Sequence, residues 1–215
     1  MPADKGGVQV GENIVLRTYV FIDRMQPQYA AFLGTVSRGD IPMAGMAQLW
    51  LEIAPGSEVY GMLDIALKSG DARSGFQDVE REFGSIELHS NSADGVLDAG
   101  HSILSRYNLR ETDKVEPQIV STKIINNISP YQAQLINRFR QGSMIVPSEC
   151  LFIMEVEPAV YITHAVNEAE KNADIKIVHF DPVGRYGRLY LSGDESLVKT
   201  AMDAAQSAIQ SLQGK

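Results

Sequence analysis

The sequence predicts an α+β protein in which one unit of strands and helices occurs twice in tandem. Residues 26–75 align without gaps with residues 129–178, at a constant offset of 103 residues. Apolar positions recur in step in the two copies, so a common fold explains both. The length of 215 residues suits two units of about 100 residues each. The offset pairs identical residues at Pro27 and Pro130, Gly39 and Gly142, Glu52 and Glu155, Pro55 and Pro158, and Gly84 and Gly187.

Each copy predicts the same order of elements. An opening strand at 14–22 or 117–125 precedes residues 26–33 or 129–136, which form a helical turn or a short strand. A glycine-marked turn then leads to an apolar strand at 48–53 or 150–156. The polar stretch 110–118 is typical of a linker. We therefore expect the first domain at residues 14–113 and the second at 117–213.

A helix follows the proline in each copy. Its apolar positions have i, i+3, i+4, i+7 spacing. Strands at 71–76 and 174–180, a glycine-containing loop, and strands at 85–90 and 188–193 come next. An amphipathic helix closes each copy. This order predicts an antiparallel or mixed sheet with helices on one side. The spaced residues are Val59, Met62, Leu63 and Ala66 in the first copy, and Ile162, Ala165, Val166 and Ala169 in the second.

Composition argues against several functional classes. The formal net charge of −8 and pI near 5.0 disfavour a nucleic-acid-binding protein. The sequence lacks an apolar run of the roughly 20 residues needed to cross a bilayer. The polar start has no signal-peptide core, so a cytoplasmic protein is expected. The single cysteine, Cys150, lies in an apolar run and is expected to be a buried thiol.

The motifs of the common enzyme classes are absent from the sequence. The four histidines lack ligand spacing and partner cysteines, which argues against a metal site. Gly184 and Gly187 precede a strand rather than a helix, so a dinucleotide loop is disfavoured. We therefore expect no catalytic residue, no metal and no cofactor.

The loop before the 85–90 strand carries an unusual charge cluster, "DVEREFG" at 78–84. Glu80 and Arg81 are adjacent, and on an extended chain they would point to opposite sides, so pairing within one subunit is not expected. The second copy keeps the aromatic-glycine pair but has Val183 and Gly184 opposite the charged residues. Charge runs are usually solvated, but this divergence on a shared scaffold favours a functional loop. The kept pairs are Phe83-Gly84 and Tyr186-Gly187.

The stretch "LWLEIAPGSEVYGMLDIALKSGDARSG" at 49–75, and its counterpart leading into "VGRYGRLYLSGD", resemble the core of bacterial microcompartment shell proteins. A strand and hairpin precede this core, as in the circularly permuted form of that ferredoxin-like domain. Two permuted domains in tandem resemble the tandem-domain carboxysome shell proteins, especially those of the β-carboxysome. The resemblance covers about residues 14–213.

This resemblance implies a trimer that imitates a hexamer and tiles the carboxysome shell beside other shell proteins. Some members stack two trimers. As the composition already indicates, neither nucleic acid nor a membrane is expected as a partner. The resemblance also places the two loops around a central pore for larger anionic metabolites, such as ribulose bisphosphate or phosphoglycerate. The implied pore residues are Glu80, Arg81, Phe83, Gly84, Val183, Gly184, Arg185 and Tyr186.

Around a threefold axis, Glu80 of one chain could accept hydrogen bonds from Arg81 of its neighbour. Three such pairs would close the pore, and their displacement would open it. Exposed pairs contribute roughly 0–1 kcal/mol each, which suits a two-state gate. Arg81 and Arg185 would attract anions.

Two other functions stay open at this stage. A regulatory protein of tandem ferredoxin-like domains would carry a saturable small-molecule pocket between the domains and would not assemble into sheets. An enzyme at a subunit interface would use Glu80 as a base, but the nearby sequence supplies neither a nucleophile nor a metal ligand.

Overall fold

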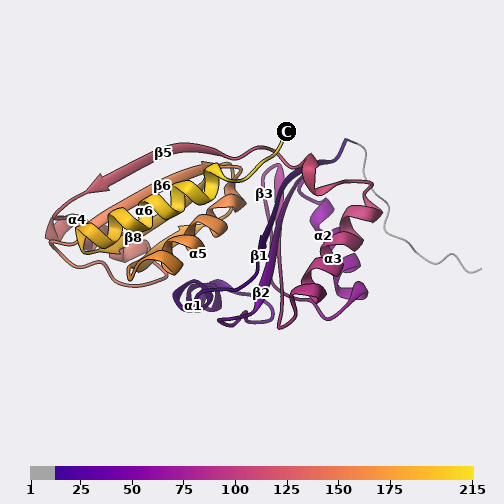
Figure 1. The fold of residues 1–215 in the computed structure, drawn as a ribbon, viewed down its shortest axis with the longest axis horizontal. Helices are drawn as coiled ribbons and strands as arrows, with labels where there is room; N and C mark the ends of the chain where they lie inside the picture. The colour runs from indigo at the N-terminus through magenta and orange to yellow at the C-terminus, as the bar shows by residue number, and fades with distance from the viewer. Residues whose placement is uncertain (1–12) are drawn as a thin grey trace, which may run out of the picture.

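A computed structural model describes residues 13–215 and contains two four-stranded antiparallel sheets with flanking helices (Figure 1). The first unit runs from β1 to η1 and has the strand order β1-β2-β4-β3; the second runs from β5 to α6 and has the order β5-β6-β8-β7. The first unit comprises β1 (Val15–Ile22), α1 (Pro27–Val36), β2 (Ala47–Ala54), α2 (Glu58–Ser69), β3 (Arg73–Glu80), β4 (Phe83–Ser90), α3 (Ala93–Arg106) and η1 (Glu111–Asp113). The second comprises β5 (Gln118–Ile125), α4 (Pro130–Phe139), β6 (Cys150–Glu157), η2 (Ala159–Tyr161), α5 (Ile162–Asn172), β7 (Lys176–Asp181), β8 (Gly187–Gly193) and α6 (Glu195–Gln210).

The structure preserves the sequence repeat element by element. β1 and β5, α1 and α4, and β2 and β6 each begin and end 103 residues apart. The strand register agrees as well, since Glu52 pairs with Ser85 where Glu155 pairs with Arg188. Residues 26–33 and 129–136 belong to helices, which settles the choice left open between helix and strand. Both helices begin with proline, whose fixed φ suits the first turn.

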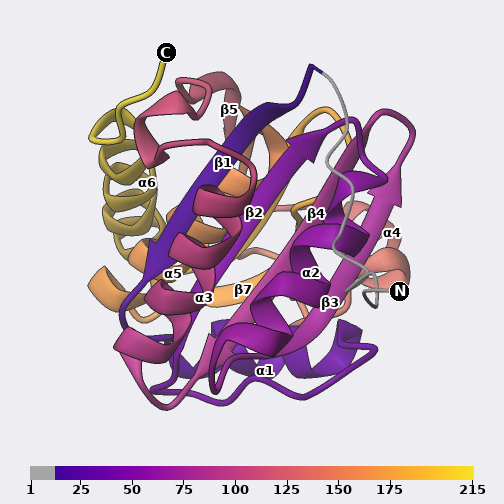
Figure 2. The same cartoon turned by 90° about the vertical axis from the view of Figure 1, so that its right-hand side faces the viewer.

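The prediction that the helices lie on one side of each sheet is wrong for α1 and α4. Helices α2 and α3 cover one face of the first sheet (Figure 2), packing on Leu49 and Leu51. Trp50 points to the opposite face and joins the core that contains α1. In the second unit α4 packs on Leu151 and Ile153, opposite α5 and α6. The central strands are apolar on both faces, so each face needs its own cover.

A shared core joins the two units. Helix α1 packs on the second unit, where the Phe32 and Phe180 rings stack with centroids 4.2 Å apart. Glu170 of α5 accepts hydrogen bonds from the backbone N–H groups of Gln28 (2.7 Å) and Tyr29 (2.8 Å). A carboxylate at a helix N-terminus is favourable because it meets unpaired N–H groups and the positive end of the helix dipole. Apolar packing and a charged cap therefore fix the relative placement of the units.

Two further findings complete the fold. Cys150 is buried, and burial raises the pKa of its thiol, as expected for a structural cysteine. Among residues 13–215, no helix is both long and apolar enough to cross a membrane.

Candidate pore loops

The first candidate loop is the tight turn that joins β3 to β4. Glu80 pairs with Phe83 across the hairpin, which leaves Arg81 and Glu82 as the two turn residues. Arg81 has φ of 55°, in the left-handed region that primed hairpin turns require. Its side chain is 90% exposed. The loop therefore presents a solvated cation at the tip of a two-stranded ribbon.

Glu80 and Arg81 lie together within one chain, so the expectation that they point apart is wrong. The Nε of Arg81 is 3.6 Å from Oε1 of Glu80. The reason is the turn: side chains alternate only along an extended strand, whereas the left-handed residue reverses the chain direction. An exposed pair at this distance contributes roughly 0–1 kcal/mol, so either side chain can exchange partners.

The second candidate loop, between β7 and β8, meets the first. Gly184 has φ of 90°, and a β-carbon there would lie 3.7 Å from Cγ of Glu80. The backbone N–H of Val183 donates to Asp181, at 3.1 Å. The fold thus brings the Glu80 side chain of one unit beside the glycine turn of the other, within a single chain.

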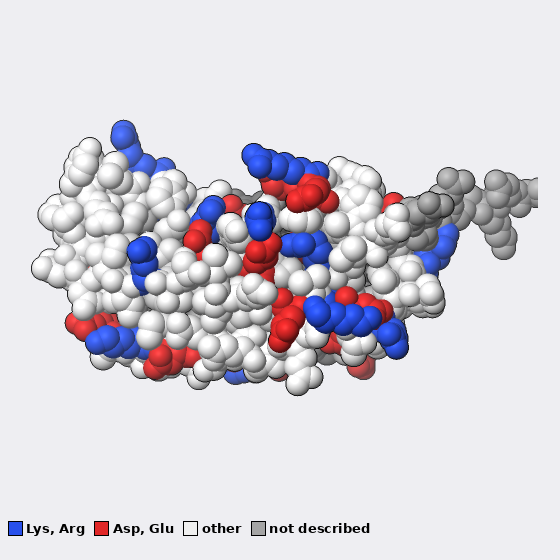
Figure 3. Space-filling model, turned by 90° about the horizontal axis from the view of Figure 1, so that it is seen from above, with Lys and Arg blue, Asp and Glu red and all other residues white. Residues whose placement is uncertain are grey.

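Arg185 differs from Arg81 in its partners. Its Nε lies 3.3 Å from Oε1 of Glu157, and its guanidinium carbon is 5.2 Å from the centroid of the Tyr186 ring. The two arginines predicted at the pore therefore belong to different local ion pairs. Figure 3 shows the wider pattern on one face, where basic and acidic side chains alternate toward the middle.

The kept aromatic-glycine pair has a steric cause. A β-carbon on Gly84 would lie 2.1 Å from the carbonyl oxygen of Gly56, and one on Gly187 would lie 2.0 Å from that of Ala159. Each strand passes so close to the turn that precedes α2 or α5 that only glycine fits. The two copies therefore keep the glycine of this pair because of packing.

Replacing Gly84 with alanine is expected to lower the free energy of unfolding by roughly 1–3 kcal/mol, because the backbone must shift to admit the methyl group. Urea denaturation followed by circular dichroism measures the loss. Gly34→Ala is the matched control, since its β-carbon would meet nothing closer than 3.5 Å. Equal stability of the two variants would contradict the steric explanation.

The side chains that support the first loop were missed in the sequence. The Arg17 guanidinium lies over the Phe83 ring, 3.6 Å from its centroid. Its Nε donates to the buried carboxylate of Glu52, whose second oxygen accepts from the backbone N–H of Val160 at 3.2 Å. One carboxylate thus connects the base of the loop to η2 of the second unit. The recurrence of Glu52 as Glu155 in the repeat was the available signal.

Glu155 has different partners. It accepts from Arg188 at 2.6 Å and from the Ser121 hydroxyl at 2.8 Å. The Arg188 hydrogen bond, followed by that of Ser121, holds the pKa of Glu155 below its ordinary value. The glutamate at this repeated position therefore accepts a hydrogen bond from the other unit in the first copy, whereas in the second copy its hydrogen-bond partners belong to its own sheet.

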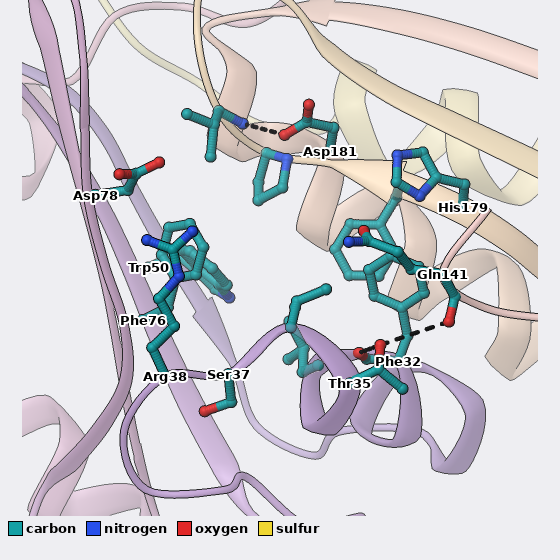
Figure 4. A pocket seen from close by; sticks show the side chains of 15 residues that line it. Phe32, Thr35, Ser37, Arg38, Trp50, Phe76, Asp78, Gln141, His179 and Asp181 are labelled. Carbon is teal, nitrogen blue, oxygen red and sulfur yellow. Dashed lines mark hydrogen bonds between the residues drawn. The ribbon is translucent and has the colours of Figure 1, made fainter. Parts of the chain in front are cut away.

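A cavity of about 570 Å³ lies between the two units, beside the loops (Figure 4). Asp78 approaches from the first sheet, and Asp181 and His179 approach from the second. Burial raises the pKa of Asp181, and the Asp78 carboxylate adds to this rise. Burial lowers the pKa of His179. The other lining residues include Phe32, Thr35, Ser37, Arg38, Trp50, Phe76, Gln141, Phe180 and Val183.

Comparisons with known proteins give consistent results. The family described as the CsoS1D N-terminal domain matches residues 16–113. The carboxysome shell protein CcmP of Synechococcus elongatus is 44% identical over 203 residues, covering 94% of this chain and 95% of that protein. The carboxysome shell protein CsoS1D of Hydrogenovibrio crunogenus is 46% identical, covering 93% and 98%.

Solved structures agree on the fold. The fused permuted hexameric shell protein MSM0275 from the RMM microcompartment superposes with a TM-score of 0.90 at 44% identity, covering 94% of this chain and 99% of that one. The double ringed trimeric shell protein MSM0271 from the same microcompartment gives 0.91 at 34% identity, with the same coverage. These similarities confirm the predicted α+β fold of two permuted units in tandem.

Proposed function

Because the chain belongs to the family of carboxysome shell proteins that includes CcmP and CsoS1D, we propose that its two loops line a gated pore in a trimeric shell tile. Membership of the family makes this chain a structural protein of the carboxysome shell. The observation that carries the pore proposal is the closeness of the Glu80 side chain to Gly184, where an added β-carbon would lie 3.7 Å from Cγ of Glu80, so the two loops lie side by side. The proposal includes no enzymatic step, metal or cofactor.

A trimer follows from two similar units in each chain. Three chains in a closed ring supply six units around one axis, alternating between first and second. One similar structure is named hexameric and another double ringed and trimeric, which supports a ring of this kind and, for some members, stacking of two rings. Other shell proteins would be the lateral partners of this ring. The boundary between the two domains, with the first ending at 113 and the second beginning at 117, stays a prediction.

The gate would work by exchange of partners. Within one chain Arg81 lies near Glu80, at 3.6 Å. In a ring, three copies of the turn would approach the axis. Each Arg81 could then form an ion pair either with Glu80 of its own chain or with Glu80 of the neighbouring chain. Pairs within chains would leave the pore open, and pairs between chains would close it. Because each exposed pair is worth only roughly 0–1 kcal/mol, three of them bias the state without locking it.

Anionic metabolites are the proposed permeants. Arg81 and Arg185 would raise the local concentration of phosphorylated sugars such as ribulose bisphosphate or phosphoglycerate at the pore. Phe83 would hold the first loop in position, since its ring lies against the guanidinium of Arg17. In the second loop, the Tyr186 ring would do the same for Arg185.

Glu80→Gln tests the gate. The substitution keeps the size of the side chain and removes its charge. Closing the pore would gather three Arg81 side chains near the axis, where the Glu80 charges offset their mutual repulsion, so we expect the closed pore to become rarer among particles classified by electron cryomicroscopy. Glu82→Gln is the matched control, because Glu82 is an exposed carboxylate in the same turn. An unchanged ratio of open to closed pores in Glu80→Gln would show that the gate lies elsewhere.

The second candidate is a small-molecule-binding regulator, and the cavity between the units favours it. Trp50, the single tryptophan, lines that cavity, so its fluorescence reports binding directly. Saturable quenching by a phosphorylated sugar, with no two-dimensional arrays in electron micrographs, would favour the regulator. Arrays without saturable quenching would favour the shell tile.

A further inference from the structure

We infer that His89 acts as a pH-dependent latch, which in its protonated form fastens residues 37–42 to the edge of the first sheet. These residues follow α1, whose last residue is Val36. His89 lies on β4 and is only 1% exposed. The latch belongs to a single chain, so it goes beyond the proposed pore and does not depend on it.

The two ring nitrogens of His89 face two carboxylates. Nδ1 donates to Oε1 of Glu87 at 2.9 Å, and Nε2 is 3.7 Å from Oδ1 of Asp40. Glu87 is as buried as His89, whereas the Asp40 side chain is 50% exposed. Nε2 itself is buried and has no hydrogen-bond partner within residues 13–215. A proton on Nε2 turns this unpaired atom into the cationic partner of Asp40.

Glu87, the inner of the two carboxylates, is held from three strands. The side-chain N–H of Gln48 on β2 donates to its Oε1 at 2.9 Å, and the backbone N–H of Gly75 on β3 donates to its Oε2 at 2.8 Å. Gln48 is oriented in turn by the Tyr29 hydroxyl of α1, which donates to its side-chain oxygen at 2.7 Å. Because these neighbours and His89 all donate, Glu87 is an acceptor only, which is the hydrogen-bonding pattern of a carboxylate.

Residues 37–42 lie against a bulge in the edge strand β3, where the register of β3 against β4 shifts. The backbone N–H groups of Arg38 and Asp40 donate to the carbonyls of Gly75 and Ser74, at 2.9 and 3.0 Å. The approach is close, since a β-carbon on Gly75 would lie 2.4 Å from the carbonyl oxygen of Asp40. Gly75 is therefore bound through its N–H by Glu87 and through its carbonyl by the loop.

The protonation of His89 depends on the charges around it. Burial lowers the pKa of His89, but the hydrogen bond to Glu87 and the charges of Glu87 and Asp40 outweigh burial, so the pKa is raised above its ordinary value of 6.5. A group whose pKa is higher in the folded protein stabilises it fully below its ordinary pKa. This contribution is lost as the pH rises through the raised pKa. Above it, the lone pair of Nε2 faces the Asp40 carboxylate, and the loop loses its attachment to the ring.

The remaining neighbours of His89 do not replace this charge. Its cross-strand partner on β2 is the neutral Gln48, and its partner on β3 is Arg73, which is exposed. Helices α2 and α3 pack on the other face of the sheet, against Leu88. The latch therefore consists of one histidine between two carboxylates.

The second unit offers an internal control because it lacks the latch. The loop at 140–145 is held there by the Asn137 side chain, which donates to the Ile145 carbonyl at 2.7 Å and accepts from its N–H at 3.1 Å. The nearby His179 has a pKa that burial lowers, so it stays neutral where His89 titrates. At an offset of 103 residues, Asp40, Gln48, Glu87 and His89 correspond to Ser143, Leu151, Tyr190 and Ser192.

The fastened loop also forms part of the cavity wall between the units. Ser37 and Arg38 line this cavity (Figure 4). Arg38 is the single Lys or Arg among its lining residues, which include the acidic Asp78 and Asp181. Release of the loop would free the one cation that offsets these two carboxylates. The latch thus connects the pH of the solution to the charge balance inside the cavity.

Hydrogen exchange at residues 37–42 tests the latch. Protection is expressed relative to the intrinsic exchange rate at each pH, at a concentration where sedimentation velocity gives the same species throughout. We expect the protection of the Gly39 and Asp40 amides to fall roughly twofold to fivefold between about pH 6.5 and about pH 9, since one half-exposed charge pair is lost. Residues 140–145 are expected to keep their protection.

Two variants identify the groups involved. His89→Gln keeps a side-chain N–H for Glu87 but cannot gain a charge, so protection of the loop should no longer depend on pH. Asp40 is half-exposed, so Asp40→Asn tests the latch without changing a buried position. It should lower the pKa of His89, which the chemical shift of the Cε1 proton reports, and should remove the pH dependence of the loop.

Asp203→Asn is the matched control, because Asp203 is an exposed aspartate on α6 of the second unit. It should leave both readouts unchanged. Three results would each overturn the latch: a loop whose protection is independent of pH in the unchanged protein, a pH dependence that persists in His89→Gln, or a pKa of His89 that Asp40→Asn does not alter. None of these results bears on the proposed pore.

Discussion

Replacing Arg17 with methionine is expected to lower the free energy of unfolding by about 3–5 kcal/mol, because the variant leaves a buried carboxylate without its cation. The Glu52 side chain is 1% exposed, and that of Arg17 is 12% exposed. Methionine keeps the length of the side chain, so lost packing is a small part of the effect. Urea denaturation at one fixed protein concentration measures the change, since assembly also contributes to stability.

Two further variants separate the charge effect from other causes. Arg17→Met combined with Glu52→Gln removes both charges and is expected to recover much of the lost stability, since a neutral pair has no desolvated ion. Lys68→Met breaks the exposed Lys68–Asp64 pair instead and should cost no more than about 1 kcal/mol. An equally small loss in Arg17→Met would contradict the buried-ion explanation.

The effect should extend to the candidate pore. Arg17 contacts the Phe83 ring, and Glu52 binds the backbone N–H of Val160 in the second unit. Loss of the arginine therefore loosens the hairpin that carries Glu80 while leaving the turn sequence unchanged. If the proposed gate depends on the position of this hairpin, Arg17→Met should also broaden the distribution of pore states.

Much of the fold could be predicted because the same order of strands and helices occurs twice in the sequence. Strands and helices depend mainly on local sequence, as in the apolar run 150–156 and the helical spacing of Val59, Met62 and Ala66. Each such element predicted in one copy has a counterpart in the other, and the structure contains both. The faces covered by α1 and α4 could not be predicted in this way. Which side of a sheet a helix covers depends on contacts such as Phe32 with Phe180, nearly 150 residues apart.

The sequence predicted where along the chain the two candidate loops lie, but not their geometry. The first was expected at 78–84, whereas β3 runs to Glu80 and β4 begins at Phe83, so only two residues form the turn. The divergence between Glu80-Arg81 and Val183-Gly184 located both loops. The pairing of Glu80 with Arg81 was missed because it depends on the left-handed backbone of Arg81, which the closing of the hairpin imposes. Arg17 was missed because its partners Glu52 and Phe83 are distant in sequence.

Replacing Phe180 with alanine is expected to lower the free energy of unfolding by about 3–5 kcal/mol, because the side chain lies fully buried where the two units meet. Its ring stacks on Phe32 and lies 5.4 Å from the Tyr29 ring, and both partners belong to α1. The resulting cavity would be lined by both units, so the loss should appear in one cooperative transition rather than in the second unit alone.

Phe180→Leu keeps most of the volume and should cost less than about 1.5 kcal/mol. Trp50 belongs to the first unit and lines the cavity between the units, so its fluorescence reports on the first unit and on the junction, whereas circular dichroism reports on both units. Coincident transitions in Phe180→Ala would show that the junction couples the units strongly enough for one chain to act as a rigid pair in a ring. Two separate transitions would show that the units fold independently and that α1 is only loosely held.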